Sequence, residues 1–483
     1  MTVKPDTKTR HPWMLALAAL IGGGAAWAFV ASRLPASSVS LATAPPVAQR
    51  APYDPSQIRS NLVFLTRKAR GDSGDPITRA MLARAYLESY RESGDAADAT
   101  RAEQAARDSL RIRTRSNSEA LLQLSRALLA QHRFSEALAV ARRATPDTDQ
   151  AYRQCADLEI EIGDYAAAER DLAKSPKRSA DPAYLALLAR LVALRGKNAD
   201  ALALLQSAAQ QADADLDMPV QSVAWFHERL GHRLASMGRL DEAEKSYQAA
   251  LEVFPRDYRT MAAMARLFAL RNEWPQVLTW GEKAAAIVPA PETLALLGDA
   301  HMALGQKAEA ARRYKLVESI AVVARSQGAI YDRQRALFLA DHNRNLGEAV
   351  ALARGELKSR KDIYTYDALA WTLYKAGQFE EADAFATRAR ALGTQDASLF
   401  YHAGAIAFAL GQRDRARLLL TRALAINPTF EPTAPRHARA LLAQLDAPAK
   451  TSAAALYFAS AGNSPRNKGV LFAVARGTTP PIR

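Results

Sequence analysis

A short residue pattern recurs about every 34 positions along most of the chain, and this period constrains the fold more than any other feature. Each copy places small residues at fixed offsets, with a turn residue in the middle and, in the best copies, a proline at the end. One copy is too small to bury its own apolar face, so the copies must stack on one another. The clearest copy holds, in order, Leu230, Gly231, Leu234, Gly238, Leu240, Ala243, Tyr247, Ala250 and Pro255.

Within one copy the pattern predicts two amphipathic helices joined by a tight turn. Gly238 occupies the turn, where glycine tolerates a positive φ at the end of a helix. Gly231 in the first helix and Ala243 in the second are small, so the two helices can approach closely. Pro255 ends the second helix because proline cannot continue it. The turns of the copies are predicted at His132, Gly163, Gly196, Gly238, Asn272, Gly305, Arg344, Gly377 and Gly411.

These copies resemble tetratricopeptide repeats, which share the small residue, the turn glycine, the alanine and the final proline. The copies at Trp225–Pro255 and Phe400–Pro428 match the family pattern well, and those before Gly196 match it poorly. The resemblance covers residues 77–430 and implies an all-α fold, an α-solenoid of about ten stacked helix-turn-helix repeats. It also implies a right-handed superhelix that binds peptides or proteins in its concave groove.

The N-terminal residues carry a separate signal. Residues 13–32 contain no charge, and this is about the length that spans a bilayer as a helix. Lys4, Lys8 and Arg10 precede them, so residues 1–12 are expected to stay in the cytoplasm. We predict a single transmembrane helix in the inner membrane of a bacterial cell, with a cleaved secretory signal as the alternative. Both interpretations place the repeats in the periplasm or otherwise outside the cytoplasm.

The segments that flank the repeats differ from them in composition. Residues 33–53 are rich in Pro, Ser and Ala, which is typical of an extended linker. Residues 54–76 are predicted to form an N-terminal capping helix, with Asp54 as its N-cap followed by proline. Residues 431–446 are predicted to form a C-terminal capping helix. Residues 447–483 do not continue the repeat and are expected to form a basic, loosely ordered tail.

The sequence contains no motif for catalysis or for cofactor binding. A phosphate-binding glycine loop and a GxSxG nucleophile elbow are both missing. His227 and His232 are five residues apart, so on a helix they point about 140° away from each other and cannot share a metal. Cys155 is the only cysteine, which excludes an intrachain disulfide, and its position predicts a buried small hydrophobe. We therefore predict a non-enzymatic protein with no cofactor and no metal.

The formal net charge of +14 is compatible with nucleic acid, an anionic membrane or acidic proteins as partners. The sequence has no nucleic-acid-binding motif and no Lys/Arg run with interleaved aromatic residues. We therefore predict a mixed charged surface with an excess of Arg, and no nucleic-acid partner.

The concave groove can be located by geometry. One face of each first helix, at spacings of three and four residues, is predicted to line the groove by the resemblance. In the three C-terminal repeats this face holds aromatic rings beside a few carboxylates. The predicted protein-binding residues are Tyr331, Gln334, Phe338, Asp341, Tyr364, Asp367, Trp371, Tyr374, Tyr401 and Phe408.

Together these observations predict a membrane-tethered scaffold or adaptor that binds a partner peptide or helix in the groove of the C-terminal repeats. Asp341 and Asp367 favour a basic or amide-rich ligand, and the Lys and Asn with which some family members clamp chaperone C-termini are missing. Packing of the same aromatic rings in the core is the alternative interpretation. Two further alternatives are self-assembly into a structural component of an envelope complex, and an enzyme with its active site in the groove.

Overall fold

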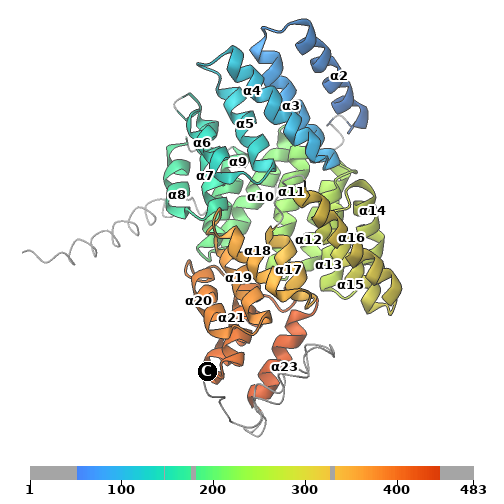
Figure 1. The fold of residues 1–483 in the computed structure, drawn as a ribbon, viewed down its shortest axis with the longest axis vertical. Helices are drawn as coiled ribbons and strands as arrows, with labels where there is room; N and C mark the ends of the chain where they lie inside the picture. Colours follow the sequence, from blue (N-terminus) through green and yellow to red (C-terminus); the bar gives the residue numbers. More distant parts are fainter. Residues whose placement is uncertain (1–49, 51, 146, 176–180, 327–331, 447–483) are drawn as a thin grey trace, which may run out of the picture. The chain divides into compact units, whose positions relative to one another are not determined.

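The structure is a computed structural model that describes residues 50, 52–145, 147–175, 181–326 and 332–446. Within these residues the chain forms 22 α-helices and no strand, which confirms the all-α solenoid (Figure 1). Among the same residues, no helix combines the length and the apolar character that crossing a bilayer requires. The predicted membrane segment 13–32, most of the linker 33–53 and the tail 447–483 lie outside the described residues.

Twenty of the helices pair into ten hairpins. The first helices are α3 (Pro76–Ser93), α5 (Ser118–Ala130), α7 (Asp149–Ile162), α9 (Pro182–Leu194), α11 (Val220–Ser236), α13 (Tyr258–Leu270), α15 (Pro291–Ala303), α17 (Asp332–Asp341), α19 (Ile363–Lys375) and α21 (Ala397–Ala409). The second helices are α4 (Ala96–Ile112), α6 (Phe134–Arg142), α8 (Tyr165–Lys174), α10 (Asn198–Ala214), α12 (Leu240–Val253), α14 (Trp274–Ile287), α16 (Lys307–Ser326), α18 (Leu346–Glu356), α20 (Phe379–Ala389) and α22 (Arg413–Ile426). One further helix flanks the hairpins at each end, α2 (Pro55–Gly71) before them and α23 (Ala434–Asp446) after them.

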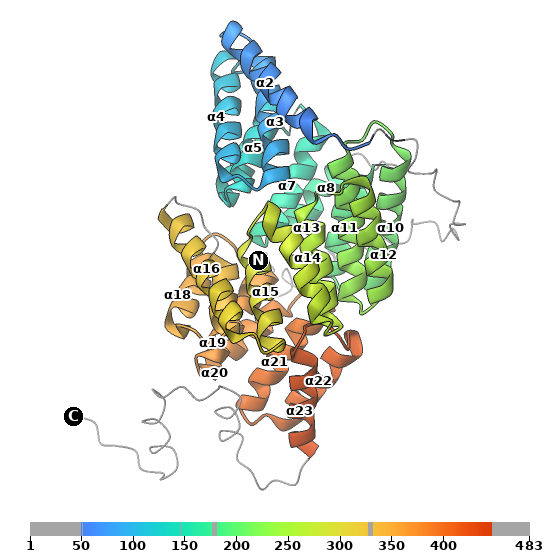
Figure 2. The ribbon, with the colours of Figure 1, turned by 90° about the vertical axis from the view of Figure 1, so that its right-hand side faces the viewer.

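Each hairpin packs against the next one along the chain, as Figure 2 shows for α11 to α15. The two helices of a hairpin approach closely because a small residue faces a large ring. A Cβ added at Gly231 of α11 would lie 2.4 Å from the ring of Tyr247 in α12, and one at Gly298 would lie 2.4 Å from the ring of Tyr314. The close helix approach predicted from these glycines is therefore confirmed, and the apolar faces of neighbouring hairpins form the core.

Local signals set the helix boundaries. Asp54 is the N-cap of α2, where its carboxylate accepts a hydrogen bond of 2.8 Å from the Ser56 amide, as the sequence predicts. The turn of the eighth hairpin differs from the prediction in detail, because positive φ falls on Asn343 and Asn345 rather than on Arg344 between them. Asparagine adopts this backbone conformation more readily than arginine, since its short polar side chain bonds locally.

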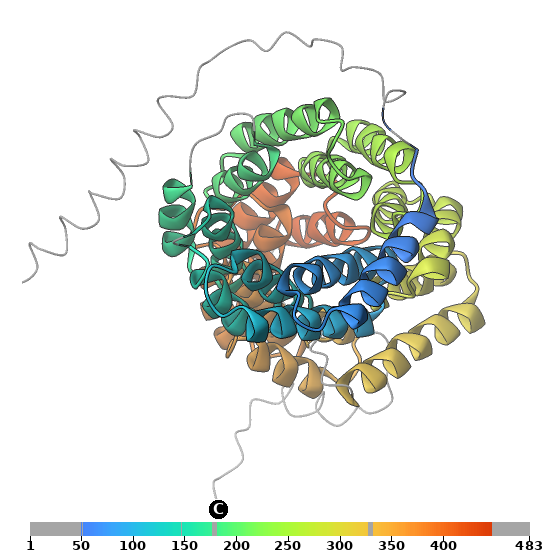
Figure 3. The ribbon, with the colours of Figure 1, turned by 90° about the horizontal axis from the view of Figure 1, so that it is seen from above.

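The hairpins wind round a common axis, so that hairpins far apart in the sequence meet (Figure 3). The Lys361 amide donates a hydrogen bond of 2.8 Å to the Ile162 carbonyl, and the Thr394 hydroxyl donates one of 2.5 Å to the Leu194 carbonyl. The turn inside the third hairpin thus contacts the connection after the eighth, and the turn inside the fourth contacts the connection after the ninth. We call this set of contacts between successive superhelical turns the inter-turn seam.

Glycine at the hairpin turns allows the inter-turn seam to close. A Cβ added at any of four turn glycines would come within 3 Å of the next superhelical turn. The glycines and their neighbours are Gly94 and Val288, Gly163 and Lys361, Gly196 and Gly393, and Gly238 and Asn427. By contrast, Gly377 and Gly411 also have positive φ, but no atom lies within 4 Å of an added Cβ. Glycine is therefore required at Gly94, Gly163, Gly196 and Gly238 both by the positive φ and by the lack of space for a side chain. At Gly377 and Gly411 only the positive φ favours glycine.

Arg360 forms an ion pair across the inter-turn seam. Its guanidinium lies 2.6 Å from the Glu161 carboxylate and also donates to the Glu161 carbonyl oxygen at 2.9 Å, which places it across the two superhelical turns. It approaches Asp362 on its own turn at 3.3 Å and covers the ring of Phe134 at 4.7 Å from the centroid. Because this charge is buried and held by several partners, removing any one partner would leave it incompletely compensated.

Candidate functional site

The inter-turn seam borders the concave face of the early hairpins, where a half-open cavity of about 1070 Å³ lies. The helices α3, α5, α7, α9 and α11 supply most of its lining. Residues of the next superhelical turn, among them Arg360, Asp362 and Thr394, complete the wall. The cavity is thus a product of the superhelix, because no single hairpin contains it.

Arginine dominates the polar lining of this cavity. Among the described residues, ten arginines line it against six aspartates or glutamates, with no lysine, which leaves an excess of four positive charges. The arginines are Arg84, Arg91, Arg126, Arg153, Arg190, Arg229, Arg233, Arg259, Arg333 and Arg360. Arginine is the side chain that pairs with carboxylate or phosphate in a planar, bidentate geometry.

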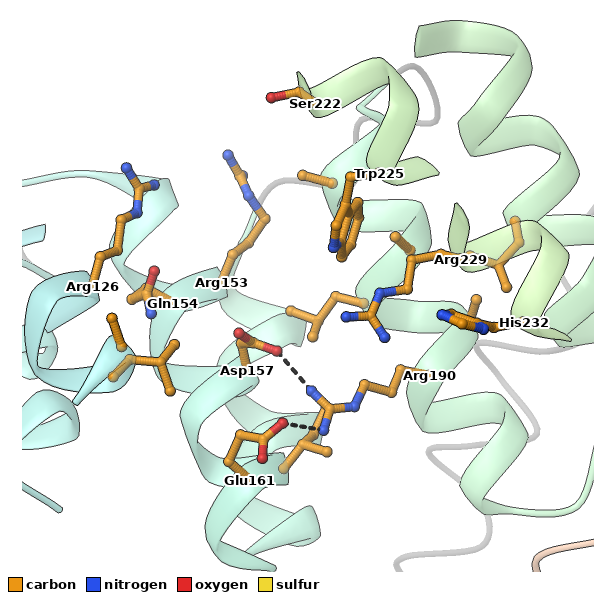
Figure 4. A pocket seen from close by; sticks show the side chains of 18 of the residues that line it. Arg126, Arg153, Gln154, Asp157, Glu161, Arg190, Ser222, Trp225, Arg229 and His232 are labelled. Atoms are coloured by element: carbon orange, nitrogen blue, oxygen red, sulfur yellow. Dashed lines mark hydrogen bonds and ion pairs between the residues drawn. The ribbon is translucent and has the colours of Figure 1, made fainter. Parts of the chain in front are cut away.

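Helical spacing brings these side chains to one face. Arg153 and Asp157 are four residues apart in α7, as are Trp225 and Arg229 in α11, so each pair lies on the same side of its helix. Figure 4 shows Arg126, Arg153 and Trp225 reaching toward the same open space, from three different helices. The Arg229 guanidinium lies 5.1 Å from the centre of the Trp225 ring, a cation–π contact.

Most carboxylates of the lining are already engaged. Arg190 approaches Asp157 at 2.8 Å and Glu161 at 2.5 Å, the two contacts drawn in Figure 4. Although burial opposes the effect, these two carboxylates raise the pKa of Arg190. Asp362 caps the start of α19, where it accepts from the Tyr364 amide at 3.0 Å and from the Thr365 hydroxyl at 2.6 Å. Such carboxylates are not available to neutralise the remaining arginines.

Several arginines of the lining have no carboxylate partner. In the part of the chain that the structure describes, Arg91, Arg126 and Arg229 form no ion pair, and Arg233 approaches only the side-chain oxygen of Asn198, at 3.4 Å. Burial lowers the pKa of Arg126, and the neighbouring charges of other arginines lower it further. Burial likewise lowers the pKa of Arg91 and of Arg233. The cavity therefore holds a group of cations that lack internal compensation.

The aromatic residues predicted for the groove come together, but they do so in a packed cluster. Trp371 stacks on His402 with ring centres 4.1 Å apart and on Tyr374 at 5.0 Å. Trp371, Tyr374 and Tyr401 are all buried, and Phe338 is buried against Tyr314. This burial favours the packing interpretation for these rings, and a role in binding stays a prediction.

The polar members of the predicted groove are engaged in the same cluster. The indole of Trp371 donates a hydrogen bond of 2.7 Å to Asp341, and Asp367 lies 2.9 Å from the ring of His402. Gln334 and Phe408 are half-buried nearby, and Tyr331 lies outside the described residues. Tyr364 is the described member of the predicted set that lines the cavity, with 43% of its surface exposed.

The histidines that resemble a metal motif have protein partners instead. His227 lies 2.8 Å from Asp213, and His232 lies 2.9 Å from the Tyr247 hydroxyl and 3.3 Å from Glu228. Within the described residues, no group of three histidine, cysteine or acidic side chains is placed to hold a metal ion. These histidines support the packing of α11 against its neighbours.

Sequence reasoning missed the arginines of the cavity, although a signal was present. The same face of the first helices that predicts the aromatic groove carries mostly Ala, Arg and Glu in the early repeats. Arg126 stands on that face and Arg229 lies beside it, but an isolated arginine on a helix is usually solvated. Only the curvature of the superhelix makes this ordinary charged face the wall of a cavity.

One segment of the chain matches a known family of repeats. Residues 226–257, which form the α11–α12 hairpin, match the family model described as tetratricopeptide repeat. None of the curated proteins matches the chain. Among solved structures, a dimer of human IFIT1 with PPP-AAAA is 16% identical, with a TM-score of 0.45 over 66% of this chain and 73% of that one. Yeast Tom70 is 13% identical, with a TM-score of 0.34 over 80% and 93%. A tetratricopeptide repeat protein of Parabacteroides merdae is 18% identical, with a TM-score of 0.32 over 55% and 98%.

Proposed function

We propose that this chain is a non-enzymatic scaffold that holds a segment of a partner protein inside its superhelix. Stacked tetratricopeptide-like hairpins are generally interaction scaffolds, and their extended concave surfaces serve binding. The observation that supports the proposal best is the half-open cavity of about 1070 Å³, whose lining includes several arginines that form no ion pair among the described residues. Arg91 and Arg229 are exposed, so their charges are accessible to a ligand in the cavity.

One residue of the predicted groove, Tyr364, also lines the cavity. Tyr364 is half exposed and lines the cavity together with Trp225, so the two rings can hold apolar parts of a bound segment. We assign the buried rings of Trp371, Tyr374 and Tyr401 to the wall that supports α19 and α21. The binding surface we propose is therefore nearer to the early hairpins than the sequence predicts.

We further propose that the scaffold is tethered to the inner membrane by residues 13–32, with the repeats outside the cytoplasm. Two features support this proposal. Residues 13–32 are uncharged and are long enough to span a bilayer as a helix, and basic residues precede them. Protease protection in spheroplasts tests this topology. Digestion of the repeats from outside is expected, and their protection in intact spheroplasts would contradict it.

The scaffold function is tested by in-cell crosslinking of the full-length chain, followed by purification and mass spectrometry. A variant with Trp225→Ala and Tyr364→Ala removes both cavity rings, and Trp280→Ala, which does not line the cavity, serves as the matched control. A partner recovered with the wild type and the control, but lost with the cavity variant, would support the proposal. A partner list that all three proteins share would place the binding surface elsewhere.

Self-association is a second candidate, and one observation favours it. The capping helix α2 exposes Val63 and Phe64, with 55% and 59% of their surfaces accessible, at the first end of the stack. Large apolar side chains in such a position are typical of a cap that contacts another protein surface. Light scattering of the wild type and of Phe64→Glu distinguishes the candidates, since self-association predicts a mass that rises with concentration and falls in the variant.

A further inference from the structure

We infer that the cavity inside the superhelix binds an acidic, extended peptide segment, whose carboxylates pair with Arg91, Arg126 and Arg229. This inference rests on the proposed scaffold function and adds the chemical class of the ligand. The three arginines come from three different helices, α3, α5 and α11, so one extended ligand can reach all of them only inside the cavity.

The first argument is the distribution of charge over the lining. Arg190 and Arg360 bind the carboxylates of Asp157 and Glu161, which leaves those groups neutralised within the protein. Arg126 instead faces the positive charges of Arg91, Arg84 and Arg153, with Glu119 as the carboxylate nearest in effect. Like charges held together in a partly desolvated space repel each other, and an anion that enters relieves the repulsion. The unpaired arginines thus indicate that the ligand is negatively charged.

The second argument concerns the kind of anion. The side-chain amides of Gln154 and Gln221 also line the cavity, and an amide both donates and accepts hydrogen bonds. A peptide backbone offers alternating N–H and C=O groups that match such amides, whereas a phosphodiester backbone offers only acceptors. The lining therefore suits a peptide with spaced carboxylates better than a nucleic acid.

The third argument excludes the chain's own ends as the occupant. Residues 1–49 and 447–483 together contain nine Lys or Arg and a single aspartate, Asp6. Segments of this composition carry the same charge as the cavity, so electrostatics opposes their entry. Their composition therefore favours an acidic occupant from another molecule.

The test is a direct binding measurement with the full-length chain in an uncharged detergent. The probe is a short fluorescein-labelled peptide of alternating Glu and Ser, compared by fluorescence anisotropy with its Gln-for-Glu counterpart. Because Arg–carboxylate pairs are charge-assisted, we expect the acidic peptide to bind at least about tenfold more tightly than the neutral one. We also expect its affinity to fall as salt is added.

Variants connect the binding to the cavity. Arg91→Gln with Arg126→Gln is expected to raise the Kd of the acidic peptide about tenfold or more. The matched control is Arg59→Gln with Arg67→Gln, which removes the same charge from exposed positions on α2 outside the cavity. If the first variant fails to fold by circular dichroism, Arg229→Gln replaces it, since this side chain is exposed and contacts the Trp225 ring on its own helix. An equal loss of affinity in the cavity variant and the control would overturn the inference.

Two other outcomes are decisive. A single-stranded oligouridylate that binds more tightly than the acidic peptide, and that depends on the same arginines, would identify a nucleic-acid site and refute the peptide assignment. Absence of peptide binding, together with a crosslinked partner that still depends on Trp225 and Tyr364, would refute the ligand class and leave the scaffold function standing. Peptide binding that depends on Arg91 and Arg126 would support the inference even if the crosslinking recovers no partner.

Discussion

Replacing Gly196 with asparagine is expected to destabilise the protein by opening the inter-turn seam. Gly196 has a φ of +78°, and a Cβ there would lie 2.4 Å from the Gly393 carbonyl oxygen and 3.2 Å from Cγ of Gln395. The nearest atom belongs to the backbone, so it can yield only if the whole connection moves. Forcing extra atoms into a packed site typically costs about 1–3 kcal/mol, and we expect Gly196→Asn to fall in that range.

A matched control separates space from backbone conformation. Gly377 has a φ of +79°, but no atom lies within 4 Å of an added Cβ. Asparagine tolerates positive φ better than other side chains, so the conformational part is the same and small in both variants. Apart from this shared conformational cost, we expect Gly377→Asn to change the free energy of unfolding by less than about 0.5 kcal/mol, as is usual for open surface positions.

The measurement is urea denaturation of wild type and both variants, followed by far-ultraviolet circular dichroism. The difference between the two variants reports the seam, because their backbone terms cancel. A similar loss of stability in both would mean that positive φ alone explains the glycine and that the seam adds nothing. No loss in Gly196→Asn would mean that the two superhelical turns do not touch in solution.

Three further predictions concern single side chains. Gly231→Ala is expected to lower the free energy of unfolding by about 1–3 kcal/mol in urea denaturation, because its Cβ would meet the Tyr247 ring at 2.4 Å, and an unchanged midpoint would contradict the close helix approach. Asp367 raises the pKa of His402, although burial of the imidazole lowers it. The charged pair therefore stabilises the folded protein fully below about pH 6.5, and this contribution is lost as pH rises through the folded pKa of His402. Asp367→Asn should flatten this dependence of the free energy of unfolding on pH, measured by urea denaturation at several pH values. Burial raises the pKa of Cys155 to about 12, so maleimide should label it only after unfolding, and rapid labelling of the folded protein would show an open core.

The hairpins were predictable because their information is local. Gly231 and Tyr247 lie sixteen positions apart on two helices joined by one turn, so their meeting follows from helical periodicity. The N-cap at Asp54 was predictable for the same reason, since a cap and its helix are adjacent in the chain. The exact residue with positive φ near Arg344 was less predictable, because Asn343 and Asn345 on both sides can adopt it.

The candidate site was predictable only in part. The aromatic rings of α19 and α21 lie together, but Trp371 and Tyr401 are buried by neighbours that the sequence pattern does not identify. Whether a ring on the concave face is exposed depends on how tightly adjacent hairpins rotate against each other. The lack of a partner for Arg126 was equally unpredictable, because the side chains around it include residues of α3 and α7.

The sequence by itself determined the repeat unit, the positions of the turns and the small residues that let two helices touch, because each depends on neighbours within one period. The tertiary structure alone decided that the turn at Gly163 meets the connection at Lys361, almost two hundred residues later. That meeting is the sum of the small rotations between several successive hairpins, and no single repeat encodes the sum. The same sum decides which turn glycines contact the next superhelical turn, and it gathers the arginines around a cavity.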